Sequence, residues 1–306
     1  MAALDDCRTR ALLNEVFAHD KRFLDDRYLH WLYRSSPSGD VIEVNHDEGL
    51  KRCGHYALVP QRWMEGGRVV KYGLSLNTAV SRDARHRGLF VRLAEDSYSL
   101  AERHGITTVV GVANASSTPG FLRRLQFANC GALPVRVVGH RRKRHLDQVL
   151  MSDRDLISSA LDAYNQSLST IRPTSYCRYW DYEELVWRLN CPIRQFQLHR
   201  VNDCLVASTR VRYHGLPIGI IAKIFGTKLN EPVPLAAVAS VVNRAHNSVC
   251  SMYCGYSPFV DVTDGFEVPS VLRPSPLNLI VRSNGLSQDI GTLQPETFEF
   301  LDFDAY

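Results

Sequence analysis

Several features of specialised proteins are missing from this sequence. No apolar stretch reaches the roughly 18 residues that cross a bilayer, and the longest lie at residues 217–225 and 235–242. The first residues, MAALDDCRTR, contain acids and lack the continuous apolar core of a secretory signal. We therefore expect a cytoplasmic protein with no membrane partner.

Metal-binding and disulfide patterns are also missing. The eight cysteines are scattered without a C-x-x-C pair, and the eleven histidines show no H-x-x-x-H spacing. A chain of 306 residues is too large to depend on disulfide bonds for its stability. The sequence therefore predicts reduced thiols and no metal.

A large excess of one sign of charge is missing as well. The net charge of +4 is too small to indicate nucleic-acid binding, although it suits a polyanionic small molecule. With 45% hydrophobic and 22% charged residues, the composition is that of an ordinary globular protein. Because 306 residues exceed a typical domain about twofold, two domains are expected.

The first half alternates between helical and strand patterns. Helices are expected up to residue 35, antiparallel strands within 41–80, and a helix after a basic loop at 81–88. A strand at 106–112, a short helix at 119–125 and a strand at 135–138 follow. The order strand, helix, strand predicts a parallel pair.

The second half repeats this order of elements. The segment YLHW at 28–31, followed by Pro37, is echoed by ELVW at 184–187, followed by Pro192. The repeat predicts domains at 1–145 and 146–306, with the boundary in a basic run. The second copy has neither the arginines nor the glycine of the loop at 81–88, so one functional loop is expected.

That loop carries the strongest chemical signal in the chain. Arg85, Arg87 and Gly88 lie just before a predicted helix. The first amides of a helix lack intrahelical acceptors, and the helix dipole is positive there, so the turn can bind an anion. Guanidinium groups add charge-assisted donors suited to phosphate oxygens. The pattern therefore favours a pyrophosphate.

In this context, residues 76–127 resemble the acyl-CoA-binding core of the GNAT superfamily of N-acetyltransferases. In that family an [RQ]-x-x-G-x-[GA] motif opens a helix, and a strand, an Asn and a short helix ending in Gly-Phe follow. Arg85-x-x-Gly88, Asn114 and Gln126-Phe127 stand here in that order. The resemblance implies an α/β (α+β) fold with two GNAT-like domains. Each would be a mixed, mostly antiparallel sheet flanked by helices, and the second copy would be degenerate.

The resemblance also implies how an acyl-CoA co-substrate binds. The backbone of Thr78, Ala79 and Val80 would pair with the pantetheine arm, and Asn114 would bond to it. The pyrophosphate would be held by the loop residues Arg85, His86, Arg87, Gly88 and Leu89. Phe90 stands where the family has a small residue.

No catalytic base or acid is evident at the family's positions. Leu74 stands where some relatives keep a Glu, and Leu122 where many keep a Tyr that protonates the leaving thiolate. Amine acylation needs a neutral amine, so Tyr72 and His55, on neighbouring strands, are the candidate bases. A purely structural role is the competing interpretation for each.

The acceptor is expected where the second half covers the first, because ligands favour domain interfaces. Arg178, Tyr179 and Trp180 offer stacking faces and a guanidinium group that suit a nucleotide-linked sugar, although simple packing is the competing interpretation. The tandem arrangement is similar to bacterial GNAT-type transferases that acylate nucleotide-linked amino sugars for surface polysaccharides.

Three functions remain open from the sequence. The first is an acyl-CoA-dependent N-acyltransferase acting on a small-molecule amine. The second is a non-catalytic sensor of acyl-CoA or a nucleotide, and the third is a basic surface that binds nucleic acid without CoA. The loop at 81–88 favours the first.

Overall fold

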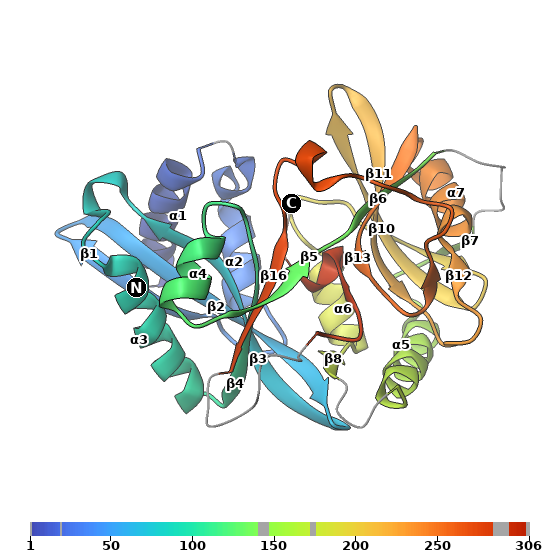
Figure 1. Ribbon diagram of the computed structural model, residues 1–306, viewed down its shortest axis with the longest axis horizontal. Coiled ribbons are helices and arrows are strands. Elements are labelled where there is room, and N and C mark those ends of the chain that lie inside the picture. Colours follow the sequence, from blue (N-terminus) through green and yellow to red (C-terminus); the bar gives the residue numbers. More distant parts are fainter. Residues whose placement is uncertain (1, 19, 140–146, 172–175, 284–293, 304–306) are drawn as a thin grey trace.

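Two mixed sheets, each with helices against it, form the body of the computed structural model (Figure 1). The structure describes residues 2–18, 20–139, 147–171, 176–283 and 294–303. The expected domain boundary at residues 145 and 146 lies outside the described residues. No helix in the described part of the chain is long and apolar enough to cross a membrane.

The first sheet contains a strand from the far end of the chain. Its order is β1 (Ile42–Glu48), β2 (Lys51–Glu65), β3 (Arg68–Val80), β4 (Ile106–Ala113), β16 (Asn278–Ser283) and β5 (Ala128–Ala132). β8 (Tyr176–Arg178) pairs with β2. β3 and β4 are parallel, as strand–helix–strand connections require, and the other pairs are antiparallel.

The second sheet has the corresponding order. It runs β7 (Asp147–Val149), β9 (Gln197–Val201), β10 (Cys204–Tyr213), β11 (Leu216–Phe225), β13 (Cys250–Tyr256), β6 (Val135–Gly139) and β15 (Phe266–Glu267). The parallel pair is β11 and β13. β17 (Phe298–Glu299) adds to β13, and β12 (Val233–Pro234) pairs with β14 (Val260–Asp261).

The two sheets exchange strands. β6 belongs to the N-terminal half of the chain but pairs antiparallel with β13, and β16 takes the equivalent place beside β4. The parallel pairing expected for the strand at 135–138 within the first half is therefore wrong. The pattern identified the strand, but its partner lies more than 100 residues away in sequence, where no local signal points to it.

Seven α-helices are found in the described residues: α1 (Ala2–Val16), α2 (Asp26–Arg34), α3 (Leu89–Arg103), α4 (Thr118–Arg124), α5 (Arg154–Ser169), α6 (Tyr182–Leu189) and α7 (Leu235–His246). Short 3₁₀ turns lie at η1 (Lys21–Leu24), η2 (Arg82–Ala84), η3 (Ser270–Leu272) and η5 (Phe300–Asp302). α3 connects the parallel strands of the first sheet and α7 those of the second, so both crossovers are built alike.

The repeated Trp positions meet at the centre of the molecule. The rings of Trp31 on α2 and Trp187 on α6 stack with centroids 5.2 Å apart. Each indole donates to the other's backbone carbonyl, at 2.8 Å and 3.0 Å. Asp25 and Asp181 cap the two helices with their side chains. The reciprocal contact is what two similar units related by an approximate twofold axis would make.

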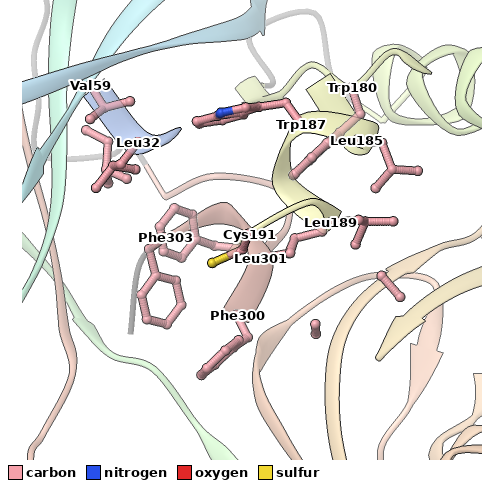
Figure 2. Packing of buried hydrophobic residues seen from close by; sticks show 14 of the residues in the cluster. Leu32, Val59, Trp180, Leu185, Trp187, Leu189, Cys191, Phe300, Leu301 and Phe303 are labelled. Atoms are coloured by element: carbon pink, nitrogen blue, oxygen red, sulfur yellow. The ribbon is translucent and has the colours of Figure 1, made fainter. Parts of the chain in front are cut away.

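One hydrophobic core spans both halves. It includes Leu32 and Val59 from the first half and Leu185 and Leu189 from α6. Figure 2 shows that Phe300, Leu301 and Phe303, near the C-terminus, pack among them. The C-terminal segment therefore holds the halves together.

Buried histidines predict an acid-sensitive fold. In the second half, Ser208 Oγ lies 2.8 Å from the Nε2 atoms of both His199 and His246. Burial lowers the pKa of both imidazoles to about 4 and that of His55, in the first half, to about 3. Below their ordinary pKa the unfolded chain takes up protons that the folded chain cannot, so stability is lost as the pH falls.

The free energy of unfolding is expected to fall by about 1.4 kcal/mol per histidine between pH 7.5 and pH 5.5. Glu299 acts in the opposite direction because burial raises its pKa to about 7, which offsets about one histidine. Urea unfolding at the two pH values measures the difference. Coincident curves would contradict it, and His199→Gln should reduce the slope with pH.

Candidate functional site

The parallel strands β3 and β4 separate halfway along their length. Their pairing runs from Lys71 and Ile106 to Ser75 and Gly111 and stops there. Residues 76–80 of β3 pair only with β2 among the described strands, while β4 continues along β16. A bulge at Asn77, which has φ of 53°, accompanies the separation. The edge of β3 at residues 76–80 is therefore open to an extended ligand.

A cavity of about 490 Å³, here called the splay cavity, fills this gap. Of the residues expected to bind acyl-CoA, it is lined by Thr78, Val80, Arg85, Phe90 and Asn114. Ala79 is buried on the other side of the strand, as alternation along a strand requires. Five of the expected residues thus meet at one place.

A smaller cavity of about 270 Å³, the loop cavity, continues from the splay cavity and shares Val80, Arg85 and Phe90 with it. It is lined further by His86, Gly88, Leu89 and Arg124, among others. Gly88 precedes α3 in a left-handed conformation, with φ of 71°. The helix start has no side-chain cap and no acidic residue in its first turn. These are the features of an anion site at a helix N-terminus.

The two arginines of the loop differ in what they bind. Arg87 pairs with Glu48 at 2.6 Å and donates to the carbonyl of Asp83 at 3.2 Å. Arg85 is exposed and forms no ion pair with any described residue. Arg85 is therefore the guanidinium available to a phosphate.

Phe90 is accommodated by a glycine on α4. Its ring packs edge-on against Phe121, with centroids 5.4 Å apart. A Cβ atom at Gly120 would lie 3.2 Å from the Phe90 ring, so the glycine leaves the space that the ring needs. A large residue two positions after Gly88 is thus compatible with the normal start of α3.

Asn114 closes the turn that leads into α4. Its Oδ1 accepts from the backbone amides of Ser116 and Ser117, at 3.0 Å and 2.9 Å. The side-chain oxygen is therefore engaged, and the amide Nδ2 makes no hydrogen bond within the described chain. Only this nitrogen of the side chain is free to donate to a ligand carbonyl.

Neither candidate base lines the splay cavity or the loop cavity. His55 is fully buried, with Nε2 3.0 Å from the hydroxyl of Tyr33 and Nδ1 2.7 Å from Oδ1 of Asn45. Tyr33 in turn accepts from Asn77, a lining residue of the splay cavity, at 3.0 Å. Burial, then the charges of Arg52 and Arg34, lower the pKa of His55 to about 3. His55 therefore supports the bulged strand from behind, two hydrogen bonds from the cavity.

Tyr72 is also placed in the core. It is 1% exposed and stacks on Trp63 at 4.9 Å. Burial, then the carboxylate of Glu65, raise the pKa of Tyr72, which makes it a poor base. For His55 and Tyr72 the structural interpretation is the one that the geometry supports.

The residues expected to bind the acceptor are largely buried. Arg178 is 1% exposed and pairs with Glu184 at 2.6 Å. Trp180 is 0% exposed and donates to Asp302 at 3.2 Å. Tyr179 is partly exposed and lies beneath the guanidinium of Arg62. Arg178 and Trp180 hold the C-terminal segment, and their role in binding the acceptor stays a prediction.

In the second sheet, the chain itself occupies the equivalent gap. Pairing of β11 with β13 stops at Ile221 and Tyr253, and β17 then pairs with β13. The Glu299 carboxylate accepts from the amide of Ile224 at 3.2 Å. A Cβ atom at Gly255 would lie 2.0 Å from the carbonyl of Phe298, so the fit is close. Of the two equivalent gaps, the one between β3 and β4 in the first sheet is therefore the open one.

Sequence reasoning missed several walls of the splay cavity. Phe17 and Arg22, near the N-terminus, and Ser275, Ile280 and Phe303, near the C-terminus, also line it. For Ile280 the only signal would have been the strand pattern of β16, which does not reveal its partner. No group of three or more metal-ligating side chains is found in the described chain.

The fold is that of the GCN5-related N-acetyltransferases, and the expected fold class is confirmed. A GCN5-related N-acetyltransferase from Anabaena variabilis ATCC 29413 has a TM-score of 0.61 and 14% identity, covering 92% of this chain and 70% of that one. One from Kribbella flavida has a TM-score of 0.58 and 12% identity, covering 92% and 69%. Eis1 from Mycobacterium abscessus has a TM-score of 0.54 and 9% identity, covering 92% and 71%. No family model and no curated protein matches the sequence.

Proposed function

We propose that the protein is an acyl-CoA-dependent N-acyltransferase that transfers an acetyl or short acyl group to a small polar amine. One observation carries the proposal: the open edge of β3 at residues 76–80 runs directly to the exposed turn around Arg85 and Gly88. An extended pantetheine arm can pair with the edge, and its diphosphate can bind the turn and the start of α3. Asn114 Nδ2 is placed to donate to the arm.

The lining of the splay cavity accounts for catalysis without a carboxylate base. No Asp, Glu or His is found among the described residues that line it. Its apolar walls, which include Phe17, Leu74 and Val112, disfavour an ammonium ion and so lower the pKa of a bound amine. The neutral amine attacks the thioester carbonyl, the C–S bond breaks, and CoA leaves as the thiolate. Water accepts the proton of the amine and protonates the thiolate.

A nucleotide-linked amino sugar for surface polysaccharide synthesis is the proposed acceptor, as a small-molecule partner in the cytoplasm. The basic cavity supports this choice because a nucleotide diphosphate is anionic. Arg178 and Trp180 have no part in the proposal, because they are buried.

A non-catalytic acyl-CoA sensor is the alternative. Leu74 lines the splay cavity at the position of a family base, and the apolar Leu122 stands where the family keeps a Tyr acid. A thiol-release assay with acetyl-CoA and longer acyl-CoAs against a panel of amines separates the two. Release with an amine supports the transferase, whereas tight binding of acyl-CoA without release supports the sensor.

Arg85→Ala is expected to raise the dissociation constant of acetyl-CoA about tenfold or more, because a charge-assisted bond to phosphate is lost. Arg87→Ala is the matched control and should have a smaller effect, since Glu48 already engages that guanidinium. Isothermal titration calorimetry measures both. An unchanged constant for Arg85→Ala would contradict the assignment of the diphosphate to this turn.

A further inference from the structure

A third cavity, here called the vestibule, opens beside the splay cavity. It measures about 710 Å³ and is lined by the end of α1, by η1 and by Ile193 and Arg194 of the second half. The vestibule shares Val16, Phe17 and Arg22 with the splay cavity and no lining residue with the loop cavity. The splay cavity therefore lies between the loop cavity and the vestibule.

This order of cavities indicates from which side each substrate enters the splay cavity. If the diphosphate of acyl-CoA binds the loop cavity, its arm runs through the splay cavity and its thioester points away from Arg85. An amine must then approach from a different side, and the vestibule is the adjoining space. Its walls come from both halves of the chain, as expected for an acceptor site between domains.

The lining of the vestibule is basic. Lys21, Arg22 and Arg194 stand against one acidic residue, Asp20. Asp20 is already bound by Arg22, whose Nε lies 2.7 Å and 2.9 Å from its two carboxylate oxygens. Lys21 is exposed and forms no ion pair with a described residue. Cationic side chains therefore outnumber acidic ones among the lining residues, with Val16, Phe17 and Ile193 as an apolar wall.

We propose that the acceptor is an amine that also carries an anionic group, a carboxylate or a phosphate, and that Lys21 and Arg194 bind this group in the vestibule. The inference rests on the proposed function and specifies its substrate class. The anion enters the basic vestibule while the amine reaches the splay cavity. Polycationic amines are disfavoured, because they would meet like charge in the vestibule.

Matched pairs of acceptors test the substrate class. Glucosamine 6-phosphate is compared with glucosamine, and leucine with leucinamide, in the thiol-release assay with acetyl-CoA. A uridine-diphosphate-linked amino sugar is the third anionic acceptor. The anionic member of at least one pair should have a kcat/KM at least about tenfold higher, and the preferred pair tells phosphate from carboxylate. Equal values within both pairs would overturn the inference and leave the transferase standing.

Variants test the assigned residues. Lys21→Gln and Arg194→Gln are each expected to raise KM for the anionic acceptor about tenfold without changing KM for the partner that lacks the anionic group. Arg27→Gln on α2 is the control, because its exposed side chain pairs with Asp25 and lines none of these three cavities. An unchanged KM for both pocket variants would overturn the assignment. Lys21 is exposed, so its variant keeps the test valid if Arg194→Gln fails to fold.

A binding measurement separates this inference from the proposed function. Calorimetry with glucosamine 6-phosphate, or with the nucleotide sugar, needs no turnover. Binding that weakens in Lys21→Gln supports the anion site even if no amine is acetylated, a result that would overturn the transferase alone. Binding that is equal in the wild type and in both pocket variants would overturn the anion site alone.

Discussion

Replacement of Lys223 by methionine is expected to lower the free energy of unfolding by about 3–5 kcal/mol, the cost of breaking a buried ion pair from one side. Lys223 is 0% exposed, and its Nζ lies 2.7 Å from Asp302 and 3.0 Å from Glu299. Burial alone would lower the pKa of this amine, but the two carboxylates raise it well above its ordinary value. Without the lysine, two acids remain buried with no cation beside them.

The pH dependence identifies the cause. Burial already raises the pKa of Glu299 to about 7, and removal of the lysine raises it further, so the loss in the variant should be larger at pH 8 than at pH 6. Urea unfolding at both values measures it. Lys228→Met is the matched control, because its pairs with Asp203 and Glu231 are exposed, and exposed ion pairs contribute little to stability. An equally small effect at Lys223 would show that the buried network is not a source of stability.

This network matters to the site because it holds the C-terminal segment. Asp302 also accepts from Trp180, and Arg178 donates to the carbonyl of Leu301 at 3.0 Å. The segment ends at Phe303, the last described residue, which lines the splay cavity. The C-terminal segment is thus anchored in the gap of the second sheet and, through Phe303, forms part of the wall of the splay cavity in the first.

Local patterns predicted the part of the site that is local in sequence. Residues 68–105 form strand, loop, helix and helix end as expected, because alternation, helical spacing and Gly105 all lie within the segment. The exposure of Arg85 and Gly88 follows from the same order, because the loop that connects a strand to the next helix lies at the surface. The Trp positions of the repeat predicted two similar units, and they stack on each other.

Long-range pairing was not predictable from one sequence. Arg178 is of a residue type that often binds ligands, but in the core its guanidinium pairs with Glu184 and donates to the carbonyl of Leu301. A guanidinium beside aromatic rings has the same appearance in a buried network and in a binding site. Likewise, the alternating pattern of β16 is that of a strand in either sheet, so only tertiary structure places it beside β4.

Val281→Asp is expected to destabilise the first half, although the substitution lies near the C-terminus. Val281 is 0% exposed, in the middle of β16, and pairs with Val110 on β4 and Ala128 on β5. A carboxylate there would be buried without a partner, which costs roughly 4 kcal/mol or more. Because β4 forms one side of the splay cavity, binding of acetyl-CoA should be lost together with stability.

Val271→Asp provides the matched control, since Val271 lies in the same C-terminal region and is 87% exposed. It should change the free energy of unfolding by less than about 0.5 kcal/mol and leave acetyl-CoA binding intact. Urea unfolding and calorimetry measure both variants. Wild-type stability and binding in Val281→Asp would show that β16 is not part of the first sheet. The conclusion that the C-terminal region supplies a wall of the splay cavity would then fail as well. Loss of both instead ties the acyl-CoA site to a strand that the chain supplies from its opposite end.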